Sequence, residues 1–380
     1  MNKLISTFNE QYDSLIESVT ELNGNFIIRT VDDRFFKFGI ESIDLLNALK
    51  SNIAVDEHLE NKLELFINNV LLPKGLYQLQ GTKKNYLPKK PKLTLHVELF
   101  SSSFVTKICS FFMWMFTPFV VCSFVISSLL INIRYFGQHS YVFSYEYIFS
   151  YTPSEIIFVL CLSIITSLFH ELGHATCCKK LSERAGDIGF GVNLFIPVFY
   201  ANVSNVHLLS SNQKAAIAIS GVYFQLILAT SLIFLIPIFP EIEKYIVLNL
   251  IGMLFNSIPF FRNDGYWLLN DLLKKEDLLK ETIIRLKSFK NIQTIHVIYG
   301  TLIIIFFTVA ILLMFNFAIN KGPSIITEIV NHQSRNFSFY LKAVLVAFHY
   351  IVITISVWML LNSIYKKITQ KLKLTTTKAS

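Results

Sequence analysis

The residue pattern with the clearest chemistry is His170-Glu171-Leu172-Gly173-His174, which lies near the end of a long apolar segment. On an α-helix, residues i and i+4 share a face, so His170 and His174 can offer two imidazole nitrogens to one metal ion. Glu171 lies beside them, where its carboxylate can accept a proton from water that the metal activates. Because ionisable groups are costly inside hydrocarbon, the pattern predicts a functional metal site within a membrane.

A second polar segment supplies a third ligand. It reads Asn256-Ser257-Ile258-Pro259-Phe260-Phe261-Arg262-Asn263-Asp264-Gly265 and follows another apolar stretch. Catalytic zinc takes three protein ligands and keeps one open position, so Asp264 would complete a His2Asp set. The HExxH pattern alone is weak and could be a chance match. The second segment makes chance a poor explanation.

Together the two segments resemble the site-2 protease family of intramembrane zinc metalloproteases. That family pairs HExxH on one membrane helix with N-x-x-P-x-x-x-x-D-G on a later one. The resemblance implies that His170, His174 and Asp264 bind Zn2+ and that Glu171 is the general base. It assigns Asn256 to the family's asparagine. In the expected mechanism the oxyanion is stabilised by Asn256 as a catalytic residue, by Gln225 or by backbone amides. The continuation Asp264-Gly265-Tyr266-Trp267 is similar to the peptide zinc metalloprotease branch.

Two positions depart from the family pattern. Many members carry G-P-x-x-N on the third span, whereas this chain has Ser220-Gly221-Val222-Tyr223-Phe224-Gln225. Gln225 either lines the site as a substrate-binding residue or bonds to a neighbouring helix. Arg262 either contacts a carbonyl or carboxylate of the substrate or marks the membrane interface. Cys177 and Cys178 lie within a turn of the motif, and we expect them to pack rather than to add a ligand.

The composition indicates an integral membrane protein. Of the 380 residues, 53% are hydrophobic and 16% charged, and 35 are phenylalanine; the mean hydropathy is +0.50. Soluble domains carry about 25% charged residues. The net charge of +8 comes from lysines and arginines at the ends of apolar segments. We therefore expect no nucleic-acid partner. The abundance of Ile, Phe, Asn and Lys is typical of an AT-rich bacterial genome.

Six apolar segments are each near the roughly 20 residues that span a bilayer. They cover about 108–133, 156–178, 215–238, 245–261, 295–317 and 340–365, with a kink expected at Pro118. Lysine and arginine concentrate before the first segment and after the second, fourth and sixth. This distribution places both termini in the cytoplasm and both motifs toward the cytoplasmic ends of their spans.

Two further regions are expected to form structure other than membrane-spanning helices. Residues 189–203 are too short and too rich in Gly and Pro for a span, so we expect a hairpin or re-entrant strand pair. Residues 1–98 predict a small α+β, winged-helix-like cytoplasmic domain. Its expected elements are strands over 26–31 and 34–38, two helices through 43–49 and about 56–70, and a last strand over 76–79. This order weakly resembles the leader-peptide recognition domain; a cap without a partner is the alternative.

The sequence thus predicts a mainly α polytopic membrane protein of three parts. They are the N-terminal domain at 1–98, a transmembrane metalloprotease domain at 99–365 and a basic cytoplasmic tail at 366–380. The leading hypothesis is a zinc metalloendopeptidase of a bacterial cell membrane that acts in maturation of a ribosomally made peptide. One alternative is regulated cleavage of a membrane-anchored regulator. The other is a non-catalytic peptide export or immunity protein. The oligomeric state stays open.

Overall fold

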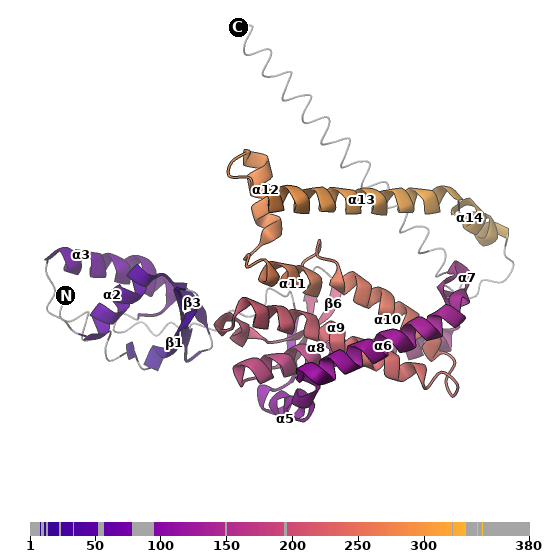
Figure 1. Cartoon of the computed structure of the whole chain (residues 1–380), viewed down its shortest axis with the longest axis horizontal. Coiled ribbons are helices and arrows are strands. Elements are labelled where there is room, and N and C mark those ends of the chain that lie inside the picture. Colours follow the sequence, from indigo (N-terminus) through magenta and orange to yellow (C-terminus); the bar gives the residue numbers. More distant parts are fainter. Residues whose placement is uncertain are drawn as a thin grey trace, which may run out of the picture. The chain divides into compact units, whose positions relative to one another are not determined.

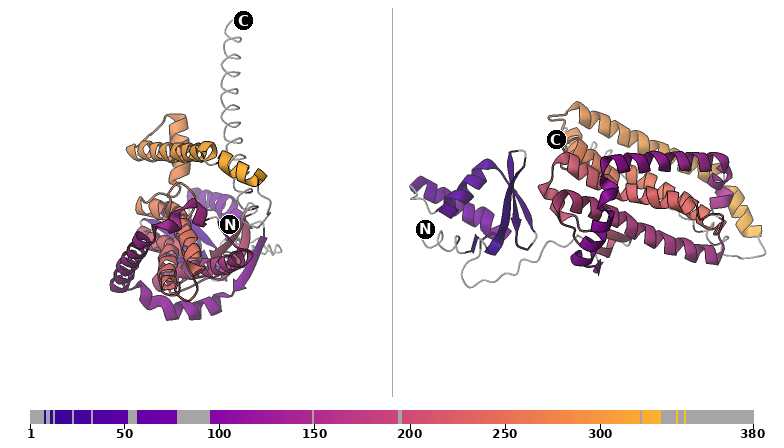
Figure 2. Two further views of the ribbon diagram at one scale, coloured as in Figure 1. Left: turned by 90° about the vertical axis from the view of Figure 1, so that its right-hand side faces the viewer. Right: turned by 60° about the horizontal axis from the view of Figure 1, so that its bottom comes forward.

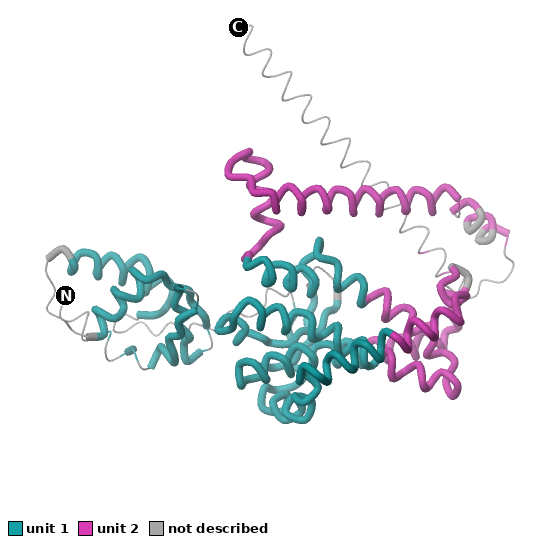
Figure 3. The backbone as a smooth tube through the Cα atoms, in the orientation of Figure 1, with its two compact units in different colours: residues 1–129, 165–228, 253–274 teal, residues 130–164, 229–252, 275–380 magenta. Residues whose placement is uncertain are grey.

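The computed structural model is mainly helical, with two small antiparallel sheets (Figure 1). It describes residues 8, 11–12, 14–22, 24–32, 34–51, 57–77, 95–148, 150–193, 196–320, 322–331, 340 and 344. The chain divides into two compact units, coloured separately in Figure 3. Unit 1 comprises 1–129, 165–228 and 253–274, and unit 2 comprises 130–164, 229–252 and 275–380.

The first elements of unit 1 form a sheet beside helices, drawn in indigo in Figure 2. They are β1 (Ile16–Leu22), β2 (Asn25–Thr30), β3 (Phe35–Phe38), α2 (Ile40–Ser51), α3 (Glu57–Phe66), a π-helical turn (Ile67–Leu71) and α4 (Leu72–Lys74). The sheet has the order β1-β2-β3, and Ile28 pairs with Val19 on one side and with Phe36 on the other. Ile28, Leu46 and Leu63 are buried in one apolar core, which holds the sheet to the helices.

The expected strands over 26–31 and 34–38 and both expected helices are confirmed, whereas β1 was not predicted. The expected strand over 76–79 is wrong at its first two residues, which form a bend; residues 78 and 79 lie outside the described part. The cause is Gly75, which adopts a left-handed conformation (φ 67°) after α4. Leu76 N–H then bonds to Leu71 O at 2.9 Å, which turns the chain and closes the helix end.

A second sheet consists of β4 (Leu95–Phe100), β5 (Ile188–Asn193) and β6 (Ile196–Ala201), in that order. The β5–β6 pair confirms the hairpin expected over 189–203, and β4 was not predicted. Because β4 bonds to β5, residues 95–98 join this sheet, although the sequence places them in the N-terminal domain. Gly189 faces the Tyr200 ring across the hairpin, where a Cβ would lie 2.2 Å from the hydroxyl oxygen.

Four helices among the described residues are long and apolar enough to cross a membrane. They are α6 (Pro118–Gln138), α8 (Pro153–Ser182), α9 (Ser211–Ile233) and α13 (Thr294–Asn320). The shorter helices are α5 (Ser102–Phe112), α7 (Tyr145–Ile148), α10 (Ile242–Ser257), α11 (Asp264–Leu272), α12 (Leu278–Ser288) and α14 (Gly322–Asn331). The chain is therefore a membrane protein. The six-span count stays a prediction, because the segment over 340–365 falls mostly outside the described residues.

The first expected span, over about 108–133, is interrupted at Pro118, where a kink was expected, and forms two helices. α5 ends at Phe112, a 3-10 turn covers Met113–Phe116, and α6 begins at Pro118. Pro118 has no N–H to donate to the preceding turn, so the chain breaks there and Pro118 becomes the first residue of a new helix. The fourth expected span corresponds to α10, which has 16 residues.

Within unit 2, a buried carboxylate joins several segments. Glu243 of α10 accepts hydrogen bonds from the hydroxyls of Tyr135, Tyr141 and Tyr147, with Tyr135 at 2.5 Å. Glu243 is 6% exposed, so these bonds replace the water that the carboxylate would otherwise bind. The next residue, Lys244, pairs with Glu155 at 2.7 Å. Together these contacts fix the start of α10.

Candidate metal centre

The helix α8 carries the two histidines. Its start is defined by Thr152, whose Oγ1 accepts from Glu155 N while Glu155 Oε2 accepts from Thr152 N. This reciprocal cap and Pro153 in the first helical position favour a long, regular helix. The helical repeat then places His170 and His174 on one face, with their Nε2 atoms 3.1 Å apart. Both side chains are buried.

Asp264 reaches the histidines from a separate segment. It is the first residue of α11, directly after the turn that follows α10. The turn is held by Asn263 Nδ2, which donates to Phe255 O at 2.7 Å. Gly265 packs so closely on the Ser257 carbonyl that a Cβ there would lie 2.1 Å from the oxygen. These contacts place Asp264 Oδ2 3.0 Å and Oδ1 3.4 Å from the two Nε2 atoms.

The geometry of the three donors fits a zinc ion. Zinc bound tetrahedrally at about 2.0–2.1 Å from nitrogen and oxygen donors separates those donors by about 3.4 Å. The separations among His170, His174 and Asp264 are 3.0–3.4 Å, and their ligand atoms lie within 4.8 Å of one another. The buried Oδ2 of Asp264 has no donor in hydrogen-bonding geometry among the described residues. A cation would satisfy this oxygen.

The outer nitrogens of both imidazoles face acceptors. His174 Nδ1 donates to Ile217 O at 2.7 Å, and His170 Nδ1 donates to Gln225 Oε1 at 3.1 Å. A donor at Nδ1 leaves the lone pair of each Nε2 directed at the cluster, which is the tautomer a metal requires. Gln225 therefore orients a ligand from the neighbouring helix α9. A contact between Gln225 and substrate stays a prediction.

A glycine leaves the space beside the donors. A Cβ on Gly221 of α9 would lie 2.4 Å from His174 Nε2 and 2.6 Å from His170 Nε2. A Cβ on Gly173 of α8 would lie 2.5 Å from Ser220 O, so α8 and α9 pack closely at this level. Neither glycine was among the site residues expected from the sequence. The available signal was Gly221 within an apolar helix, where glycine marks a close approach.

Glu171 contacts the second sheet from beside the metal ligands. Its carboxylate accepts a hydrogen bond from the main-chain N–H of Ala201 in β6 and interacts electrostatically with both histidines and Asp264. The motif glutamate is thus held near the cluster without being one of its three ligands. This is the arrangement that a general base needs.

The other candidate residues lie as follows. Asn256 is half-buried near the end of α10, and among the described residues no hydrogen bond joins it to the three ligands. Arg262 is exposed on the turn before α11. Cys177 and Cys178 are buried in an apolar cluster with Leu209. The catalytic role of Asn256 and the substrate contact of Arg262 stay predictions.

Comparison with known proteins gives one informative relative. The chain is 20% identical over 222 residues to a Bacillus subtilis (strain 168) protein named "Putative peptide zinc metalloprotease protein YydH". The matched region covers 57% of this chain and 83% of that protein. No family model and no solved structure matches the chain.

Proposed function

We propose that this chain is a membrane-embedded zinc endopeptidase. The observation that carries the proposal is the convergence of His170, His174 and Asp264 at 3.0–3.4 Å, with Glu171 beside them. The ligands come from two segments separated by ninety residues of sequence, so the spacing is a property of the fold. The name of the distant relative supports the same class.

The chemistry follows from the residues at the site. Zinc, when bound by this set, supplies Lewis-acid activation of water and of the scissile carbonyl. Glu171 accepts the proton that the attacking water loses and passes it to the leaving amine nitrogen. The Ala201 amide orients the Glu171 carboxylate. Asn256 and Gln225 are candidates for stabilising the oxyanion, and Arg262 for holding a substrate carbonyl.

For the substrate, we propose a small, ribosomally made peptide precursor. The N-terminal sheet has β1 and β3 at its edges, and an edge strand offers N–H and C=O groups to which an extended peptide can add. This geometry supports binding of a leader peptide by the N-terminal domain. Cleavage of a membrane-anchored regulator is the second candidate role.

The proposed setting is a bacterial cell membrane with both termini in the cytoplasm. Lys179 and Lys180 lie at the end of α8, about one and a half turns after His174, and such residues favour the cytoplasmic side. The metal centre then lies near the cytoplasmic surface, from which water can reach it.

The experiment compares peptide termini in membranes of bacteria that express the wild type or Glu171→Gln at equal levels. We expect new termini of a short peptide in the wild type alone. New termini confined to a membrane-anchored regulator would favour the second role. Identical terminal profiles in the two strains, with the candidate precursors present, would contradict the enzymatic proposal.

A further inference from the structure

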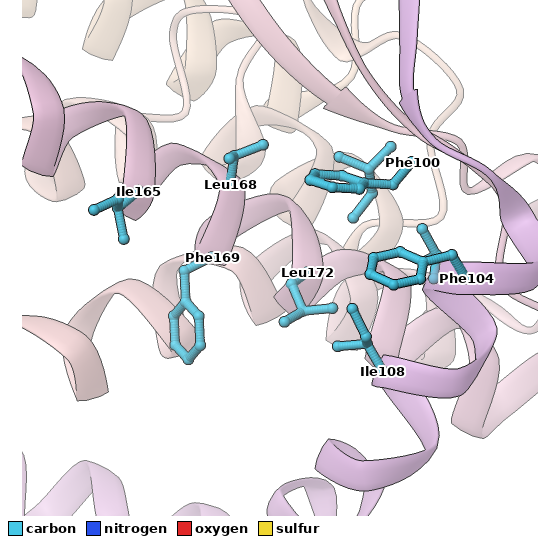
Figure 4. A pocket seen from close by; sticks show the side chains of 9 residues that line it. Phe100, Phe104, Ile108, Ile165, Leu168, Phe169 and Leu172 are labelled. Atoms are coloured by element: carbon cyan, nitrogen blue, oxygen red, sulfur yellow. The ribbon is translucent and has the colours of Figure 1, made fainter.

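An apolar cavity of about 210 Å³ lies in unit 1, on α8 but outside the metal centre. The nine side chains around it are all hydrocarbon, and they come from β4, α5, α8 and β5. Figure 4 shows Leu168 and Leu172 of α8 pointing toward Phe100, Phe104 and Ile108. The rings of Phe100 and Phe104 stack with their centroids 5.5 Å apart and form one wall.

The cavity is separate from the proposed catalytic site. Ile165, Leu168 and Leu172 recur at the spacing that places residues on one face of a helix. His170 is two residues from Leu168 and from Leu172, about 200° around the helix axis. The zinc ligands therefore face α9 and α11, while the cavity lies on the opposite side of α8.

The position of the cavity favours a lipid chain as its occupant. α8 is one of the helices that can cross a membrane, and its Ile165 is 54% exposed at the edge of the cavity. Phe104, on the α5 side, is 47% exposed. In a bilayer, both side chains meet hydrocarbon, so the opening admits an acyl chain without exposing apolar surface to water.

Positive charge lies where the head group of such a lipid would be. Lys107 of α5 is exposed and adjoins Ile108 of the cavity wall. Lys179 follows Leu172 by two helical turns, about 10 Å along the axis, and its Nζ donates to Thr106 O of α5 at 2.6 Å. Among the described residues no carboxylate pairs with Lys107 or Lys179. Between Glu98 and Glu146 the sequence contains no acidic residue.

We propose that this cavity binds one acyl chain of an anionic phospholipid, whose phosphate contacts Lys107 and Lys179. The lipid braces α5 against the face of α8 opposite the metal ligands. The proposal does not depend on the protease activity, because binding is measured without turnover.

The test uses the full-length protein in nanodiscs that contain phosphatidylglycerol with a photoreactive diazirine on one acyl chain. Cross-linked peptides are located by mass spectrometry. We expect labelling to be enriched over 100–108 and 165–172 relative to α6 and α13, and a phosphatidylcholine probe of the same chain length to label these residues much less. Lys107→Gln, a surface change that does not threaten folding, should weaken phosphatidylglycerol binding about fivefold.

Ile108→Trp fills the cavity and should abolish the enrichment. Its matched control is Ile126→Trp, which places the same side chain on the exposed surface of α6 and should leave labelling unchanged. Equal labelling of α6, α13 and the cavity, or equal labelling by the two head groups, would overturn the proposal. So would a cavity that is labelled only after residues 340–365 are deleted, because that segment would then be the occupant.

Discussion

Gly221 provides a quantitative test of the metal centre. In Gly221→Ala the added Cβ would lie 2.4 Å from His174 Nε2 and 2.6 Å from His170 Nε2. Both nitrogens would have to move by about 1 Å to reach ordinary van der Waals contact. The donors are only 3.0–3.4 Å apart, so a shift of this size removes them from a common tetrahedral site. We expect zinc affinity to fall about 10- to 100-fold, as for loss of a ligand-orienting contact.

The assay is competition for zinc with a chromophoric chelator in detergent, together with thermal unfolding of the metal-free protein. The control is Gly252→Ala in α10, where a Cβ meets no atom within 4 Å. Alanine is about 1 kcal/mol more favourable than glycine inside a helix, so this variant should bind zinc normally and be slightly more stable. Normal zinc affinity in Gly221→Ala would refute the placement of α9 against the ligands.

Three further predictions concern named side chains. Gln225→Leu should weaken zinc binding about 10-fold by removing the acceptor for His170 Nδ1, and Gln225→Glu should restore it. Burial raises the pKa of Asp271 to about 6, with Lys214 opposing the shift. The folded protein therefore binds the Asp271 proton more tightly than the unfolded chain does, which stabilises the fold. This stabilisation is complete below the unfolded pKa of about 3.9 and is lost as the pH rises through 6. Asp271→Asn should therefore flatten the pH dependence of the free energy of unfolding between these two values. Glu243→Ala should destabilise the fold by about 3 kcal/mol, measured by chemical unfolding in detergent, because it removes the buried acceptor of three tyrosine hydroxyls.

Each of these has an outcome that contradicts it. Equal zinc affinities in Gln225→Leu and Gln225→Glu would mean that the amide does not orient the histidine. A pH profile of unfolding that is unchanged in Asp271→Asn would exclude the titration of that carboxyl. The control for Glu243→Ala is Glu241→Ala, which changes an exposed neighbour. Equal loss of stability in these two variants would mean that the tyrosine hydrogen bonds of Glu243 do not stabilise the fold.

The metal ligands could be predicted from the sequence because their geometry is largely local. The i, i+4 spacing fixes the relation of His170 to His174, and the Asn263–Gly265 turn fixes the start of α11. Two arguments implied that Asp264 lies near the histidines: the family resemblance, and the loop charges that place both motifs toward the cytoplasmic ends of their spans. For Gly221 the sequence offered only a glycine within an apolar helix. The Ile217 carbonyl and the Ala201 amide could not be predicted, because their roles arise from the packing of α9 and β6 on α8.

Some elements of the fold could be predicted from the sequence and others could not. The β5–β6 hairpin and α8 follow from Gly and Pro positions and from long apolar runs. β4 reads Leu95-His96-Val97-Glu98-Leu99-Phe100, an alternation that indicates a strand, but its partner lies almost ninety residues later. The break before α6 could be expected from Pro118 only as a kink, since the 3-10 turn depends on Thr117 and Trp114.

The most direct test is the zinc content of the purified, full-length protein under metal-replete conditions. It compares the wild type with Asp264→Ala, Glu171→Gln and Asp271→Ala, the last as a control for loss of a carboxylate elsewhere in α11. We expect one zinc per chain in the wild type, Glu171→Gln and Asp271→Ala, and little in Asp264→Ala. A wild type without zinc, or an Asp264→Ala variant with as much as the wild type, would contradict the His2Asp site.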